Sequence, residues 1–216
     1  MKLVIWDIDG TLVDSHAQIM AAMQAGTTRA GLPPLSASQV SSIVGLSLPV
    51  AVATLLPDAD PATRAEVVEG YRSHYFAARS AAESPLFPGA LDCLERLAGR
   101  GDMLMAVATG KSRRGLDGLL AAHGLGGYFA ATHCADGHPS KPAPAMILSC
   151  LSDTGARDAV MIGDTSFDML MARNAGVAGL GVGWGHHPAA ELFAAGARSV
   201  ATDFPQLHAL IEEWAA

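Results

Sequence analysis

Short apolar runs alternate with longer amphipathic stretches along most of the chain. The apolar runs predict buried strands at residues 3–6, 103–108, 129–134, 159–162 and 179–182, with a last edge strand near residue 200. The stretches between and after them predict helices at residues 90–98, 112–123, 144–151, 167–175 and 205–214. Strands that alternate with helices are typical of a parallel sheet with helices on both faces. The predicted fold class is therefore α/β, with a doubly wound, Rossmann-like parallel sheet.

Residues 15–84 depart from this alternation, because they show helical patterns and no strand-like run. The expected helices cover residues 16–30, 36–44, 46–56 and 61–81, with Asp60 and Pro61 as a start signal for the last of them. We interpret this segment as an α-helical cap domain inserted after the first strand. The core domain then consists of residues 1–14 and 85–216, and the cap domain of residues 15–84.

Composition narrows the classes of protein that need to be considered. Half of the 216 residues are hydrophobic and the formal net charge is −7, without a basic run, so we expect no nucleic-acid partner. No apolar stretch is long enough to span a membrane, and Asp7 interrupts the first apolar run too early for a signal peptide. The three cysteines form no Cys-x-x-Cys pair. We expect a cytoplasmic protein, monomeric or homodimeric, without a membrane partner.

Polar side chains follow several of the predicted strands at the point where each strand ends. Parallel strands bring their carboxyl ends to one edge of the sheet, so these side chains are expected to converge. They are Asp7 and Asp9, Thr109, Asp164 and Asp168, with Lys141 in a further loop. Clustered carboxylates suit Mg²⁺, and an ammonium with a hydroxyl suits a phosphate group. Together they indicate phosphoryl transfer.

A calcium loop and an ordinary turn are two other interpretations of the acidic pair Asp7 and Asp9. A calcium loop needs glycine at its sixth position, whereas Gly10 is only the fourth residue counted from Asp7, and a strand precedes it. An ordinary turn would explain Asp-x-Asp-Gly alone. It does not explain the polar residues that follow the other strands.

The order and spacing of these motifs resemble the haloacid dehalogenase superfamily. The matching residues are Asp-x-Asp-Gly-Thr-Leu-x-Asp-Ser at 7–15, Thr-Gly-Lys at 109–111, Lys-Pro at 141–142 and Gly-Asp-x-x-x-Asp at 163–168. Within that superfamily the chain is similar to phosphatases of the phosphoglycolate phosphatase type, which carry a helical cap after the first strand. The resemblance covers essentially the whole chain.

The resemblance implies the role of each acidic residue. Asp7 would attack phosphorus and become an aspartyl-phosphate, and Asp9 would serve as general acid and then as general base. Mg²⁺ would be held by Asp7, Asp164 and the backbone carbonyl of Asp9, with Asp168 supporting these ligands. For Asp9 to act as an acid, we expect its acidic surroundings to raise its pKa.

The same resemblance implies how the phosphate group is held. Thr109 and the backbone N–H groups near Ile8 and Gly110 would bind phosphate oxygens, and Lys141 would neutralise charge on the phosphate and on Asp7. Gly10 permits the turn after the strand, and a further role for it stays open.

The expected activity is Mg²⁺-dependent hydrolysis of a small phosphomonoester, with phosphoglycolate as the first candidate. Asp9 and the Gly-Asp-x-x-x-Asp motif argue against a dehalogenase, and a cap without lysine argues against a phosphonate-cleaving enzyme. A sugar-phosphate mutase of the same superfamily remains an alternative. A non-catalytic phosphate-binding or regulatory protein is a more remote one.

Several further residues are expected to be structural. Ser15 is predicted to cap the first cap helix, and His186-His187 is predicted to form an exposed turn, although contact with the leaving group stays open. Tyr71, Tyr75 and Phe76 are spaced for packing on a helix. Arg72 either faces the active site or pairs locally on its own helix.

Overall fold

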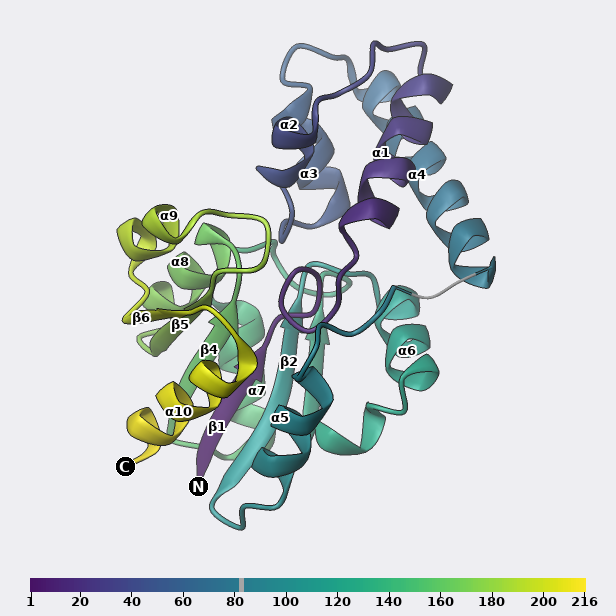
Figure 1. The fold of residues 1–216 in the computed structure, drawn as a ribbon. Helices are drawn as coiled ribbons and strands as arrows, with labels where there is room; N and C mark the ends of the chain where they lie inside the picture. The colour runs from purple at the N-terminus through teal and green to yellow at the C-terminus, as the bar shows by residue number, and fades with distance from the viewer. Residues whose placement is uncertain (82–83) are drawn as a thin grey trace.

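The computed structural model describes residues 1–81 and 84–216, and the side chains of all of these except 78–81 (Figure 1). Six parallel strands form one sheet in the order β3-β2-β1-β4-β5-β6. The strands are β1 (Lys2–Trp6), β2 (Met103–Thr109), β3 (Ala131–Cys134), β4 (Asp158–Gly163), β5 (Ala178–Val182) and β6 (Ser199–Ala201). This order reverses between β1 and β4, where doubly wound sheets place their ligands.

Helices cover both faces of the sheet. One hydrophobic cluster joins one face to α5, α6 and α10, and a second joins the opposite face to α7 and α8. These helices and α9, which packs beside α8, are α5 (Ala90–Ala98), α6 (Arg113–Ala122), α7 (Ala145–Thr154), α8 (Ser166–Asn174), α9 (Ala189–Ala195) and α10 (Phe204–Ala215). The predicted α/β fold class is thus confirmed.

Strand β1 shows why its sequence requires two covered faces. Val4 and Trp6 belong to the cluster with α5, α6 and α10, whereas Leu3 and Ile5 belong to the cluster with α7 and α8. All four side chains are fully buried, because successive residues of a strand point to opposite faces and both faces carry helices. A continuous apolar run is therefore what this central position demands.

Residues between β1 and α5 form four helices that share a hydrophobic cluster of their own. They are α1 (His16–Arg29), α2 (Ala37–Ser41), α3 (Leu48–Leu55) and α4 (Pro61–Ala81), and we call them the cap helices. Figure 1 shows them beyond the end of the sheet that lies opposite the two chain termini. The division into domains at residues 14/15 and 84/85 stays a prediction, and residues 82 and 83 lie outside the described residues.

The structure differs from the sequence-based prediction in a few elements. Helix α9 and a 3₁₀ turn at Gly126–Tyr128 were not predicted, because both are short and follow turn-like segments. Ser15 occupies the N-cap position of α1 as predicted, but its hydroxyl makes no capping hydrogen bond. Among the described residues no helix combines the length and the apolar character that a membrane span requires.

Helices α1 and α4 approach each other closely at two glycines. A Cβ atom added to Gly70 would lie 2.8 Å from the Cα of Gly26, which is closer than real side chains allow. We expect Gly70→Ala to destabilise the protein by about 1–3 kcal/mol through overpacking, partly offset by roughly 0.5–1 kcal/mol from the helix preference of alanine. Thermal unfolding should show the melting temperature lowered by a few degrees.

Gly101→Ala is the matched control, since nothing lies within 4 Å of a Cβ at that position. It should leave the melting temperature unchanged. A Gly70→Ala protein as stable as wild type would contradict the close helix contact.

Candidate active site

The chain turns sharply just after β1. The carbonyl oxygen of Ile8 accepts hydrogen bonds from the backbone N–H groups of Thr11, Leu12 and Val13. Gly10 lies inside this turn with a φ of 77°, and a Cβ there would lie 2.2 Å from Oδ2 of Asp164. Glycine is therefore required twice, for the left-handed backbone and for the close approach of a carboxylate.

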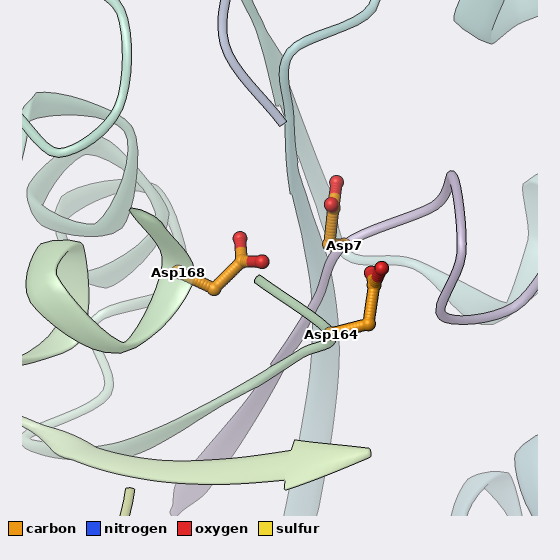
Figure 2. Close-up of side chains that lie close together, drawn as sticks. All are labelled: Asp7, Asp164 and Asp168. Carbon is orange, nitrogen blue, oxygen red and sulfur yellow. The ribbon is translucent and has the colours of Figure 1, made fainter. Parts of the chain in front are cut away.

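Three buried carboxylates meet at the end of the sheet (Figure 2). Asp7 follows β1, Asp164 follows β4, and Asp168 lies in the first turn of α8. One oxygen of each lies within 4.8 Å of the others. Their convergence follows from the parallel pairing of β1 with β4, which brings the ends of the two strands side by side.

The ammonium of Lys141 lies among these carboxylates and is itself buried. Its Nζ donates a hydrogen bond of 2.6 Å to Oδ1 of Asp168 and lies 3.0 Å from Oδ1 of Asp7. The other oxygen of Asp168 accepts hydrogen bonds from the backbone and hydroxyl of Thr165, the residue that caps α8. Asp168 is thus engaged on both oxygens, which suits a supporting role.

The carboxylate of Asp7 is less well satisfied. Its Oδ1 lies 3.0 Å from the Nζ of Lys141, and within residues 1–81 and 84–216 its Oδ2 has no hydrogen-bond partner. A buried carboxylate oxygen without a hydrogen bond is costly. This oxygen is accordingly available to a ligand.

The acidic cluster carries more negative than positive charge. Burial raises the pKa of Asp7 to about 6, although Lys141 opposes the shift, and the carboxylates of Asp168 and Asp9 add to it. Burial, together with Asp168 and Asp7, raises the pKa of Asp164 well above its ordinary value. A divalent cation would relieve both penalties, so the donor set fits Mg²⁺.

Asp164 is oriented by two groups that the sequence analysis left without a role. Its Oδ1 accepts a hydrogen bond of 2.7 Å from the hydroxyl of Thr11, and its Oδ2 accepts one of 2.8 Å from the backbone N–H of His186. Thr11 stands inside the Asp-x-Asp-Gly-Thr motif, so its position was a usable signal. No sequence signal placed the backbone of His186 there.

The His186-His187 segment is not an exposed turn, so that prediction was wrong. His187 is only 6% exposed, and its Nδ1 accepts a hydrogen bond from the backbone N–H of Ser166. The ring of His186 packs close to Gly10. Neither histidine lines the cavity described below, so the geometry gives no support for contact with a leaving group.

Asp9 points away from the acidic cluster and pairs with Lys111. The Nζ of Lys111 lies 2.7 and 2.9 Å from the two carboxylate oxygens of Asp9. Burial raises the pKa of Asp9, but the charge and hydrogen bonds of Lys111 outweigh it, and the pKa lies below its ordinary value. The expected rise was therefore wrong for this state of the protein. Thr-Gly-Lys was recognised as a motif, but no role was given to its lysine.

Lys111 also connects the sheet to the cap helices. Its Nζ donates a hydrogen bond of 2.7 Å to the hydroxyl of Tyr75 on α4. A second contact joins the backbone N–H of Ser47, before α3, to the hydroxyl of Ser140 at 2.8 Å. The cap helices thus reach the residues beside Asp9 and Lys141.

The predicted phosphate-binding groups lie around the same point. Thr109 is buried at the end of β2, and its hydroxyl accepts a long hydrogen bond of 3.4 Å from the backbone N–H of Lys111. The backbone N–H groups of Ile8 and Gly110 donate to no acceptor in the part of the chain that the structure describes. Amides with unused donors beside a lysine suit the oxygens of an anion.

A cavity of about 220 Å³ lies between the cap helices and the end of the sheet. Asp7, Asp9, Thr109, Gly110 and Lys111 line it from the core side. Cap residues, which include Tyr71, Arg72, Tyr75 and Phe76, line it from the other side. The three aromatic residues of α4, predicted to serve packing alone, therefore also face the cavity, and Arg72 faces the site.

A doubly wound sheet with a carboxylate cluster, a buried lysine and unused backbone amides at a cavity defines an enzyme that acts on an anionic substrate. The family model for haloacid dehalogenase-like hydrolases matches residues 4–182. The chain belongs to this family, as its motifs predicted.

Relatives with known names or structures agree with this assignment. The chain is 36% identical to "Probable phosphatase IndB" of Dickeya dadantii strain 3937, with 97% of this chain and 95% of that protein covered. It is 34% identical to a "Phosphoglycolate phosphatase" of Agrobacterium fabrum strain C58, with 85% and 81% covered. The crystal structure of a hydrolase from Pseudomonas syringae matches with a TM-score of 0.88, 26% identity and 99% of both chains covered.

The raised pKa of Asp7 leads to a test of stability without metal. A carboxyl whose pKa is raised on folding destabilises the folded protein once the pH exceeds the pKa values of both states. Between pH 4 and pH 6 this penalty grows, and it reaches at most about 3 kcal/mol above that range. Asp7→Asn should therefore melt a few degrees above wild type at pH 7.5 in EDTA, and this gap should narrow toward pH 4.

Asp58→Asn removes the same charge from an exposed turn and should leave the melting temperature unchanged. If Asp7→Asn melted below wild type under these conditions, the account of an electrostatic penalty at Asp7 would be refuted.

Proposed function

We propose that the protein is a Mg²⁺-dependent phosphatase that hydrolyses a small phosphomonoester through an aspartyl-phosphate on Asp7. The observation that carries this proposal is the carboxylate of Asp7 itself. It is buried, lies 3.0 Å from the ammonium of Lys141, has one oxygen without a hydrogen-bond partner among the described residues, and lines the cavity. Such a group is positioned to act as a nucleophile toward a bound phosphate.

The metal would be held by the carboxylates of Asp7 and Asp164 and by the backbone carbonyl of Asp9. Asp168 would support these ligands while it holds Lys141 in place. When bound, Mg²⁺ would neutralise charge on the phosphate and on the carboxylates around it. Lys141 contributes a second, permanent positive charge at the same place.

The first step forms the bond between an oxygen of Asp7 and phosphorus and breaks the bond from phosphorus to the alcohol oxygen. Asp9 donates its proton to that alcohol oxygen as it leaves. In the second step Asp9 takes a proton from a water molecule, whose oxygen attacks phosphorus. The bond between phosphorus and the oxygen of Asp7 breaks, which releases inorganic phosphate and restores the carboxylate of Asp7. The hydroxyl of Thr109 and the backbone N–H groups of Ile8 and Gly110 hold the phosphate oxygens throughout.

The ion pair between Asp9 and Lys111 adds a condition to this mechanism. Asp9 cannot donate a proton while the ammonium of Lys111 contacts both of its oxygens, because this contact favours the ionised carboxylate. The pair must separate when substrate enters. A phosphate group bound at Thr109 and Gly110 would compete for the ammonium, since Lys111 follows directly in the chain.

Phosphoglycolate is the first substrate to test, because the relative from Agrobacterium fabrum is named "Phosphoglycolate phosphatase". A mutase would use the same Asp7 and Asp9 and would return the phosphoryl group to a sugar hydroxyl, so the products distinguish the two reactions. A cytoplasmic location, a monomeric or homodimeric state and the absence of nucleic-acid and membrane partners stay predictions.

Release of inorganic phosphate from a panel of small phosphomonoesters tests the proposal. We expect release by the wild type with Mg²⁺, and none in EDTA or from Asp7→Asn. Conversion of a sugar phosphate into its isomer without phosphate release would indicate a mutase instead. No reaction of either kind would favour a non-catalytic protein.

Replacement of Asp9 tests its role as acid and base. Asp9→Asn should lower kcat by about 10²–10⁴, because the leaving oxygen and the water lose their proton partner. Binding of inorganic phosphate in Mg²⁺, followed by calorimetry, should change by only a few fold. Asp14→Asn, an exposed carboxylate in the same loop, serves as the control and should keep wild-type turnover. Wild-type turnover in Asp9→Asn would rule out the assigned role.

A further inference from the structure

The cap side of the cavity differs sharply from its phosphate-binding end. Its wall is formed by aliphatic and aromatic side chains from α1, from the segment around α3 and from α4. They include Ile19, Met23, Val44, Leu48, Tyr71 and Phe76, and the polar Ser47 and Arg72 also line this side. A surface of this kind binds apolar groups by removing them from water, and it gives little to a short polar molecule.

Aromatic rings form a continuous part of this wall. Tyr71 and Tyr75 are stacked, with ring centroids 5.7 Å apart and an angle of 8° between their planes. The ring of Phe76 meets that of Tyr75 edge-on, at 85° and 6.4 Å. All three residues lie on α4 and line the cavity. The Nζ of Lys111 lies 5.0 Å from the centroid of the Tyr75 ring, and the guanidinium carbon of Arg114 lies 4.1 Å from that of Phe76. Ring edges and the faces that these cations do not cover suit a further ring.

The charges in the cavity do not favour a small acid such as glycolate. Its lining residues include two cations, Lys111 and Arg72. The ammonium of Lys111 contacts Asp9 and Tyr75, and Arg72 is an exposed residue. A carboxylate packed against the aliphatic side chains of this wall would lose water and find no polar partner among them, which is costly.

The size of the cavity also favours a substrate with an apolar group. An apolar cavity of roughly 150 Å³ is enough to hold benzene. The present cavity measures about 220 Å³ and begins at Asp7 and Asp9, where the phosphate would bind. It therefore has room for a ring beside the phosphate end.

We propose that the cap cavity selects phosphomonoesters whose alcohol carries an apolar ring, in preference to the two-carbon phosphoglycolate. This inference rests on the proposed phosphatase function and names the class of its substrate. The phosphate end supplies the chemistry, while Leu48, Tyr71 and Phe76 supply the recognition of the alcohol.

Three esters of primary alcohols test this selectivity: ethyl phosphate, 2-phenylethyl phosphate and phosphoglycolate. Ethyl phosphate and 2-phenylethyl phosphate have uncharged alcohol groups and differ by the ring alone. Their leaving oxygens are chemically alike. We expect kcat/KM for the phenylethyl ester to exceed that for each of the other two by about tenfold or more, since buried apolar groups discriminate on this scale.

A matched pair of variants on α3 assigns the selectivity to the cavity. Leu48 and Leu55 are the first and last residues of α3, both are half-buried, and both pack on the cap cluster, but only Leu48 is among the cavity-lining residues. Leu48→Asn should reduce the phenylethyl-to-ethyl ratio of kcat/KM several fold, whereas Leu55→Asn should keep the wild-type ratio. If the variants fail to fold, competitive inhibition of the wild type by 2-phenylethylphosphonate and ethylphosphonate gives the same comparison.

Each outcome separates this inference from the proposed function. Hydrolysis of all three esters with similar kcat/KM, or a preference for phosphoglycolate, would overturn the inference and leave the phosphatase function intact. An equal change of the ratio in both leucine variants, or equal inhibition by the two phosphonates, would overturn it as well. Hydrolysis of none of the esters would contradict both proposals.

Discussion

The ammonium of Lys141, buried between the carboxylates of Asp7 and Asp168, is the interaction on which the site depends. One cation cannot balance these two acids and Asp164. Burial raises the pKa of both Asp7 and Asp164, and neighbouring carboxylates add to each shift, although Lys141 opposes the shift at Asp7. Asp7 and Asp164 come together because β1 and β4 are neighbours and end at the same edge of the sheet. In the proposed function, a divalent cation and the phosphate that it binds would offset the repulsion among these acids.

The cap helices complete a site that the sheet alone leaves open. Lys111 contacts the carboxylate of Asp9 on one side and the hydroxyl of Tyr75 on α4 on the other. This one ammonium links the ionisation of Asp9 to the position of the cap helices. In the proposed mechanism it also responds to the substrate. Asp7, Asp9 and Thr109 line the cavity from the core, and residues of the cap helices and the segments between them line it from the other side. In the proposed function, chemistry and recognition are thus carried by different segments of the chain.

The sequence was sufficient for features that depend on local pattern or on topology. The continuous apolar run at 3–6 required a central buried strand, and parallel pairing then brought Asp7, Asp164 and Asp168 together.

The sequence was insufficient where a contact joins distant segments. The pKa of Asp9 was expected to rise because its acidic neighbours are visible in the sequence, whereas Lys111, 102 positions away, is the group that lowers it. The rings on α4 fit helix packing, and only the fold shows that the same rings face a cavity. Helix α9 was missed because a helix this short has a weak pattern.

The central claim is that Asp7 becomes phosphorylated during turnover. The most direct test is acid quenching of the wild-type protein during hydrolysis of a phosphomonoester in Mg²⁺, followed by mass spectrometry of the peptide that contains residues 3–15. The account predicts that a fraction of this peptide carries the mass of one phosphoryl group, located on Asp7, and that the Asp7→Asn protein shows none. Rapid phosphate release without any phosphorylated peptide, or a phosphoryl group on another residue, would contradict it.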